Sequence, residues 1–195
     1  LKYHGHVSEL FVNARDKQML LGANSLTLQC RETDAPVRAQ VQYFILPNAC
    51  VGALARTLTI ENTGNGVLDL EVLDGLPAIV PHGIGDWHLK CMTQTARAWM
   101  ETVGGKTGVP RYRVRASLED SARVEPITGF AFGFSCVEEG KRLPVLWDPE
   151  AVFGQDTSFV HPHGFARMDL PELISAHQRC QNLFPWFLFL SLIHI

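Results

Sequence analysis

The sequence lacks the features that mark several large functional classes. Charged residues make up 19% of its 195 positions, and 17 basic residues against 20 acidic ones leave a net charge of -3. This balance gives no electrostatic case for binding nucleic acid, which would need a strongly basic face. No apolar run reaches the ~20 residues that a membrane-spanning helix needs. We therefore expect neither nucleic acid nor a membrane among the partners.

Paired cysteines are also missing. No two of the 5 cysteines stand in a CxxC arrangement; they are Cys30, Cys50, Cys91, Cys136 and Cys180. An odd number of widely separated cysteines indicates reduced thiols, which are typical of a cytoplasmic protein. The first residues show no apolar stretch of a signal peptide, which agrees with that location. Because the sequence starts with Leu1 and not with Met, we expect it to be a fragment.

Motifs for nucleophilic catalysis, nucleotide binding and metal binding are absent or incomplete. The sequence contains no G-x-S-x-G, no P-loop and no G-x-G-x-x-G. Two H-x-H pairs, His4 with His6 and His161 with His163, would each offer two zinc ligands from one strand face. Zinc usually has three or four ligands, and no cysteine or carboxylate stands nearby at a familiar spacing. We therefore expect no metal ion.

What the sequence does contain is period-two alternation of apolar residues. In VRAQVQYFIL the alternating residues are Val37, Ala39, Val41 and Tyr43, a pattern typical of a half-buried strand. RYRVRASLE and GFAFGFSCV continue the pattern, and the glycines of the latter suggest close backbone approach or a bulge. The predicted face of the first comprises Tyr112, Val114, Ala116 and Leu118, and that of the second Phe130, Phe132, Phe134 and Cys136.

One dipeptide predicts a hairpin. Asn65-Gly66 stands between the strand-like stretches LARTLTIE and VLDLEVLD. Both central residues of a tight primed turn need positive φ, which Asn and Gly adopt readily. We therefore expect Leu54–Glu61 and Val67–Leu73 to pair, with the chain leaving the sheet at Asp74.

One segment has a helical period. Apolar and small residues recur at steps of three and four between Ile84 and Trp99, which predicts one helix near 87–100 with Asp86 as its N-cap. Many short antiparallel strands predict a mainly β fold, a two-sheet antiparallel β-sandwich. We assign residues 1–182 to this sandwich, incomplete at one or both ends, and expect the apolar tail 183–195 to be a non-native end.

Two groups of polar residues are open to a functional or a structural interpretation. Asp74, His82, Asp86 and Trp87 could bind a sugar through hydrogen bonds and ring stacking; alternatively they serve a turn, a cap and the core. RYRVR places three arginines on one face, where they could bind phosphate or carboxylates. The alternative is a solvated face with Glu or Asp opposite on a neighbouring strand. The residues alone favour the structural interpretation of both groups.

Three ordered blocks resemble the N-terminal domain of the cellobiose phosphorylase family. They are RTLTIENTGNGVLDLEVLDGLPAIVPHGI, MTQTARAWMETVGGKTGVPRYRVRASLEDSARV and LPVLWDPEAVFGQDTSFVHPHGF. The resemblance covers roughly residues 5 to 180. It implies a galactose mutarotase-like β-sandwich that packs on an (α/α)6 barrel of the same chain. It also implies that the full-length parent is an inverting glycoside phosphorylase acting on β-linked glucosides.

The resemblance also implies which domain of the parent carries the catalytic residues. Inorganic phosphate, the co-substrate, replaces the activated water of an inverting glycosidase, and the barrel carries the general acid. We therefore expect no catalytic residue and no organic cofactor in this chain, which alone would be inactive. Its loops would line the oligosaccharide cleft, and the candidate substrate-binding residues are Asp74, His82, Asp86, Trp87, Arg115 and Asp156. The alternative is a free-standing carbohydrate-binding or dimerisation module, and the parent itself could be a homodimer.

Overall fold

The computed structural model describes residues 1–12, 14–76, 79–92, 99–104, 109–119, 121–156, 158–179 and 189–194. The chain divides into two compact units, Leu1–Val72 and Leu73–His194. Antiparallel strands dominate the described residues, so the prediction of a mainly β protein is confirmed.

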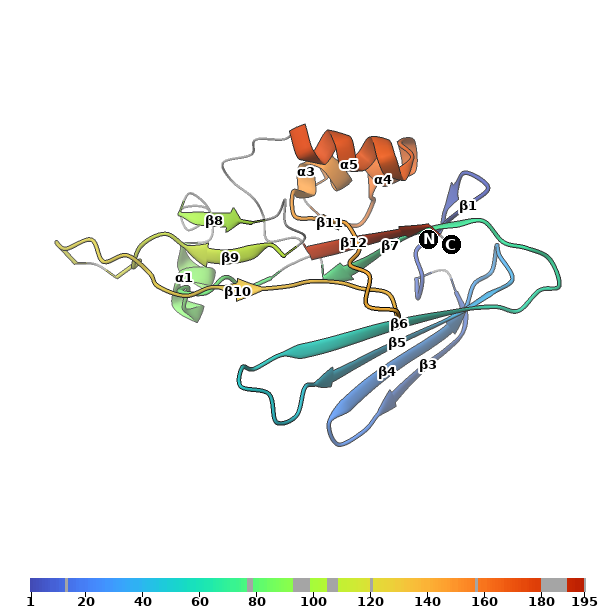
Figure 1. Cartoon of the computed structure of the whole chain (residues 1–195), viewed down its shortest axis with the longest axis horizontal. Helices are drawn as coiled ribbons and strands as arrows, with labels where there is room; N and C mark the ends of the chain where they lie inside the picture. Colours follow the sequence, from blue (N-terminus) through green and yellow to red (C-terminus); the bar gives the residue numbers. More distant parts are fainter. Residues whose placement is uncertain are drawn as a thin grey trace. The chain divides into compact units, whose positions relative to one another are not determined.

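The first unit contains a long antiparallel sheet with the strand order β3-β4-β5-β6 (Figure 1). Its strands are β3 (Arg15–Leu21), β4 (Ser25–Arg31), β5 (Val37–Ile45) and β6 (Leu54–Asn62). The predicted alternation is confirmed on β5, where Val37, Ala39 and Val41 are buried. Ala39 also packs with Cys30 and Ala14 in a small apolar cluster, so one face of this sheet forms the core of the unit.

A short hairpin opens the chain. β1 (Lys2–Tyr3) pairs with β2 (His6–Val7), and Tyr3 stands opposite His6. The two turn residues have positive φ, 48° at His4 and 79° at Gly5, as a two-residue primed turn requires. β1 also pairs with the start of β7 (Leu70–Leu76). Because His4 lies in the turn and not on a strand, the first H-x-H pair does not share a strand face.

The predicted hairpin at Asn65-Gly66 is wrong. β6 pairs with β5, whereas the start of β7 pairs with β1. The side chain of Asn62 organises the connection, accepting from the Gly64 amide at 2.9 Å and donating to the Gly66 carbonyl at 2.7 Å. These local bonds replace the tight turn that the dipeptide favours.

The second unit contains a sheet with the order β10-β9-β8. Its strands are β8 (Met100–Val103), β9 (Arg111–Val114) and β10 (Ala131–Phe132). Tyr112 and Val114 are fully buried, which confirms the inner face predicted for RYRVR. Tyr112 packs with Met100 in a core cluster, and partly buried side chains surround them: Ile79, Ile84, Leu118, Ala131 and Trp147.

The prediction of a single helix near 87–100 is wrong in length and in number. The helices of the described residues are α1 (Asp86–Cys91), α3 (Pro149–Phe153), α4 (His163–Arg167) and α5 (Leu170–Arg179). Met100 already belongs to β8, and residues 93–98 of the predicted helix lie outside the described residues. The last three helices gather together (Figure 1), and their buried side chains include Val152, Phe165 and Leu173.

Part of the apolar tail forms a strand. β12 (Phe189–His194) pairs with β11 (Val145–Leu146), with Val145 opposite Ser191. Among the residues that the structure describes, no helix has the length and apolar character needed to cross a membrane.

Candidate functional site

His82 lies beside β9 in the second unit and extends its sheet by one position. It forms a parallel bridge with Arg113. The His82 amide donates to the Tyr112 carbonyl at 3.4 Å, and the Val114 amide donates to the His82 carbonyl at 2.9 Å. The backbone of this candidate residue is therefore held on a strand, and the strand brings it next to the arginine face.

The imidazole of His82 is fixed by the segment that precedes β10. Its Nε2 atom hydrogen bonds to the Thr128 carbonyl at 3.0 Å, which makes that nitrogen the protonated one. Gly129 follows with φ of 100°, and a Cβ atom there would lie 2.9 Å from Nε2. The predicted close backbone approach at this glycine is confirmed, and its partner is the imidazole.

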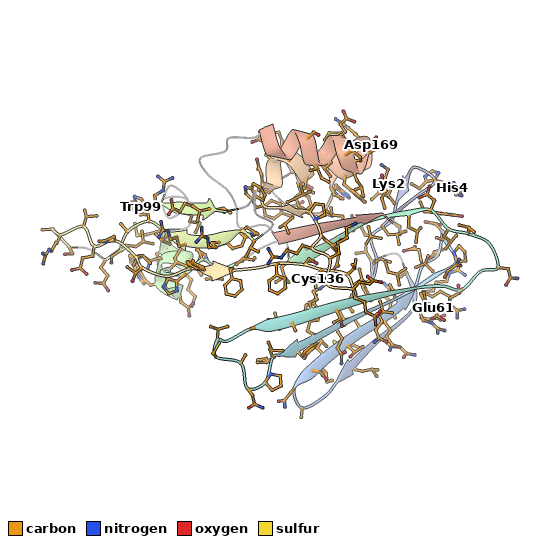
Figure 2. The ribbon with its side chains drawn as sticks, viewed as in Figure 1. Lys2, His4, Glu61, Trp99, Cys136 and Asp169 are labelled. Carbon is orange, nitrogen blue, oxygen red and sulfur yellow. The ribbon has the colours of Figure 1, made fainter. Side chains whose placement is uncertain are left out.

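Glu101 forms ion pairs with two of the three arginines. It stands opposite Arg113 in the β8–β9 register. Its Oε1 accepts from Arg113 Nε at 2.5 Å, and its Oε2 lies 3.3 Å from Arg115 Nε. The prediction that an acidic residue on a neighbouring strand would face the arginines is therefore confirmed. The Arg115 amide donates to the Trp99 carbonyl at 2.9 Å (Trp99 is labelled in Figure 2), so both its backbone and its side chain are positioned.

Arg111 has an aromatic partner. Its guanidinium carbon lies 5.1 Å from the centre of the Phe130 ring, within the range of a cation–π contact. Phe130 meets Phe132 edge-on with ring centres 6.3 Å apart, so the two rings share a face as predicted. Both rings are exposed, 45% and 48% respectively, and they are not part of the core.

Helix α1 carries Asp86 and Trp87, and neither residue has the structural role predicted for it, the N-cap for Asp86 and the core for Trp87. The N-cap is Gly85, and no side chain caps the helix, so Asp86 is a residue of the first turn and not the cap. Its negative charge still suits a helix start. Trp87 is 60% exposed, so the alternative that placed it in the core is wrong. His88 fixes the helix through a 3.1 Å hydrogen bond to the Leu118 carbonyl.

Asp74 lies inside a strand. β7 continues to Leu76, so Asp74 does not begin the exit loop as predicted. The start of this strand is paired with β1 and not with β6.

Asp156 organises its own loop. Its Oδ1 accepts from the amide of Ser158 at 2.9 Å and from the hydroxyl at 2.5 Å, and its Oδ2 accepts from the His161 amide at 3.0 Å. Chiefly through the Ser158 hydroxyl, and then through the two amides, these bonds lower the pKa of Asp156 to about 2. Both oxygens therefore already accept hydrogen bonds within the loop, as an Asx turn does.

Of the six candidate residues, the structure brings His82 and Arg115 close to the same strand, β9. His82 bridges Arg113 on this strand, and Arg115 follows its last residue. The resulting face is cationic and aromatic and can offer guanidinium donors and rings to a polar ligand. Two residues of the site were not named from the sequence: Glu101, the partner of the arginines, and Thr128, the partner of His82. Glu101 could have been found from the alternation in METV; the Thr128 carbonyl left no signal. Within the described residues, no three His, Cys, Asp or Glu side chains form a metal site.

Comparison with known proteins adds no assignment. No family model, no curated protein and no solved structure matches this chain.

Proposed function

We propose that this chain is the non-catalytic N-terminal β-sandwich portion of a glycoside phosphorylase, of the galactose mutarotase-like type. The proposal depends on one observation: two of the three blocks that resemble the family are in contact. His82, from the first block, bridges Arg113, from the second. The end of the first block thus contacts the second block, which is compatible with both belonging to one family domain.

In this proposal the chain lends residues to a sugar cleft whose chemistry belongs to an (α/α)6 barrel. His82 forms a bridge with β9, Arg115 directly follows the end of β9, and Trp87 presents an exposed ring. Rings and guanidinium groups of this kind stack on sugars and donate to their hydroxyls. The barrel's acid would protonate the glycosidic oxygen while inorganic phosphate attacks the anomeric carbon.

Phosphorolysis assays test this proposal. The 195-residue chain should release no glucose 1-phosphate from cellobiose or laminaribiose with phosphate, whereas the same chain joined to the barrel of its source gene should. In the joined protein, Trp87→Ala should raise KM for the disaccharide. Turnover by the chain alone, or a source gene without a helical barrel, would contradict the proposal.

A dimerisation module is the second candidate, and one observation favours it. At one end of the β3–β6 sheet, the face that buries Val37 and Ala39 carries exposed apolar side chains: Met19, Leu21, Ile45 and Leu54, from 59% to 76% exposed. A contiguous apolar patch of this kind marks protein contacts. Sedimentation velocity should then show a dimer that Ile45→Lys dissociates, while Thr57→Lys on the opposite face should leave it intact.

A further inference from the structure

A cavity in the first unit is lined by none of the six candidate sugar-binding residues. Its volume is about 190 Å³, and it is lined by Leu1, Tyr3, His4, His6, Ser8, Glu32, Asp34 and Ala35. At ~30 Å³ for each water molecule, this volume holds roughly six waters or a small organic molecule. The lining comes from two places, the β1–β2 hairpin and the β4–β5 connection, and all of it belongs to one unit.

Glu32 is the principal feature of this cavity. The residue is 4% exposed, and its Oε1 accepts from the Thr33 amide at 2.8 Å. Its Oε2 is buried and has no hydrogen bond partner among the described residues. Likewise, no described Lys, Arg or His residue makes an ion pair with the Glu32 carboxylate. Removing a carboxylate oxygen from water without a donor is costly, and a donor from a ligand would remove the cost.

Ser8 provides a second polar group of the same kind. It is 8% exposed, and its Oγ is buried without a hydrogen bond partner in the described residues. Its backbone is fixed, because the Ser8 amide donates to the Leu1 carbonyl at 2.8 Å. Two buried side chains therefore line one cavity with unused hydrogen-bonding capacity, and both are held by ordered backbone.

The backbone around the cavity is rigid as well. The Glu32 amide donates to the Val37 carbonyl at 2.8 Å, which closes the β4–β5 connection. On the hairpin, the rings of Tyr3 and His4 lie 4.1 Å apart and tilted by 53° (Figure 2 labels His4). A site built on paired strands and a closed loop is preorganised, and preorganisation reduces the entropic cost of binding.

We propose that this cavity binds a small organic cation, with an ammonium group against Glu32 and Ser8. The charge of the lining selects this class: Glu32 and Asp34 are acidic, neither Lys nor Arg lines the cavity, and the α-ammonium of Leu1 donates to the Ser8 carbonyl at 2.9 Å. An ammonium brings several donors, which suit Glu32 Oε2 and Ser8 Oγ together. The carbon chain of the ligand lies against Leu1 and Ala35, and the ring of Tyr3 adds cation–π attraction.

Three probes of matched shape test the charge and the hydroxyl separately. Butylammonium chloride, sodium butyrate and butan-1-ol are titrated at constant ionic strength into the 195-residue chain, and the proton resonances of the His4 and His6 rings are followed by NMR. His4→Gln and His6→Gln assign these resonances. Butylammonium should shift them saturably, whereas butyrate and butanol should not. Equal binding of butanol, or of glucose, overturns the proposal in favour of a polyol site.

Substitutions in the cavity test whether the ammonium group binds to Glu32 and Ser8. Glu32→Gln keeps the Oε1 acceptor and should weaken butylammonium binding about tenfold or more, since a buried charge loses its partner. Glu61→Gln, an exposed carboxylate that pairs with Arg38, should leave it unchanged. Ser8→Ala should weaken it by a smaller factor and serves if Glu32→Gln does not fold. Unchanged binding in both cavity variants overturns the proposal, as does the absence of a shift at about 10 mM, ten times the Kd of a millimolar site.

Discussion

Glu101 on β8 accepts a hydrogen bond from Arg113 on β9 at 2.5 Å, directly across the antiparallel register. The same carboxylate reaches Arg115 through its second oxygen. One acid thus holds two guanidinium groups of a three-arginine face. The side chain of Glu101 is 19% exposed, so this contact is better shielded from water than an ordinary surface pair.

Replacing Glu101 with glutamine should destabilise the second unit by about 1 kcal/mol, because two guanidinium groups lose their shared counter-charge. The measurement is the urea midpoint, with the slope unchanged. Glu61→Gln is the matched control, since the Arg38–Glu61 pair is 3.3 Å long and about half exposed on both sides. It should cost less than ~0.5 kcal/mol. Equal midpoints for the two variants would contradict the assigned role of Glu101.

Gly129→Ala should cost about 2 kcal/mol, because it combines a positive φ with a clash against His82 Nε2. Gly140→Ala separates the two effects: Gly140 has φ of 80° and nothing within 4 Å of the added Cβ. Thermal unfolding should show a smaller loss for this control. In a His82→Ala background, the cost of Gly129→Ala should fall to the level of the control. If the cost stays the same, the imidazole is not what the glycine accommodates.

Gly164→Ala should abolish most of the stability of the helical part of the second unit. An added Cβ would collide with the carbonyl oxygen of Ala151, a backbone atom of α3 that cannot rotate away. The expected cost is about 3 kcal/mol or more. Gly85→Ala is the control, since its nearest neighbour is His88 Nδ1 at 3.6 Å, an ordinary contact. A melting temperature for Gly164→Ala equal to that of Gly85→Ala would show that α3 and α4 do not pack as described.

The parts of the fold that sequence reasoning predicted depend on local alternation. Burial of Val37 and Ala39 on β5, and of Tyr112 on β9, follows from period two alone. An acid facing the arginines likewise follows from the rule that like charges on one strand attract an opposite charge across the ladder. Such features need no knowledge of which distant segment supplies the partner strand.

The parts that failed depend on distant or side-chain partners. The start of β7 pairs with Lys2 and Tyr3, far away in sequence, and no local pattern encodes that choice. Helices α3 and α4 have 5 residues each, so their period is weak, whereas α5 has 10 residues and was missed despite its length. Asp148-Pro149 was a readable start signal, since Asp148 caps α3 by accepting from the Glu150 amide at 3.0 Å. In the candidate site, the contact of His82 with Thr128 spans 46 residues, which alternation does not reveal.

Asp156 should make the stability of the protein depend on pH in the acid range. Its folded pKa, about 2, lies below the ordinary value of 3.8 for an aspartate, so the charged form is favoured by folding. Its contribution is therefore fully present above about pH 4 and is lost as the pH falls towards 2. The melting temperature of wild type minus that of Asp156→Asn should be constant above pH 4 and shrink below it.

The hydroxyl of Ser158 provides the control for this dependence. Ser158→Ala removes the largest cause of the lowered pKa, so the folded pKa rises towards the unfolded one, and the loss of stability in acid that Asp156 causes should be smaller than in wild type. Ser121→Ala removes a hydroxyl that accepts from the Arg123 amide in another loop, and it should leave the pH profile unchanged. A profile of Ser158→Ala that matches that of wild type would contradict the role given to this hydroxyl.

Cys30 should resist alkylation under conditions in which Cys50, Cys91 and Cys136 react. It is 2% exposed, whereas the other three are exposed. Burial raises the pKa of the Cys30 thiol above that of an ordinary cysteine. The negative charge of Glu32 raises it further, whereas a hydrogen bond with the Phe11 backbone lowers it. The reactive thiolate is therefore scarce at neutral pH, and access to it requires opening of the first unit.

Mass spectrometry of iodoacetamide-treated protein measures this directly. At pH 7.5, the peptides of the exposed cysteines should be modified at least about tenfold faster than the peptide of Cys30, and about 6 M urea should abolish the difference. Glu32→Gln should speed the reaction of Cys30 without changing that of Cys136, because it removes one cause of the raised pKa. Rapid labelling of Cys30 in the folded wild type would show that the cluster of Ala14, Cys30 and Ala39 is not closed.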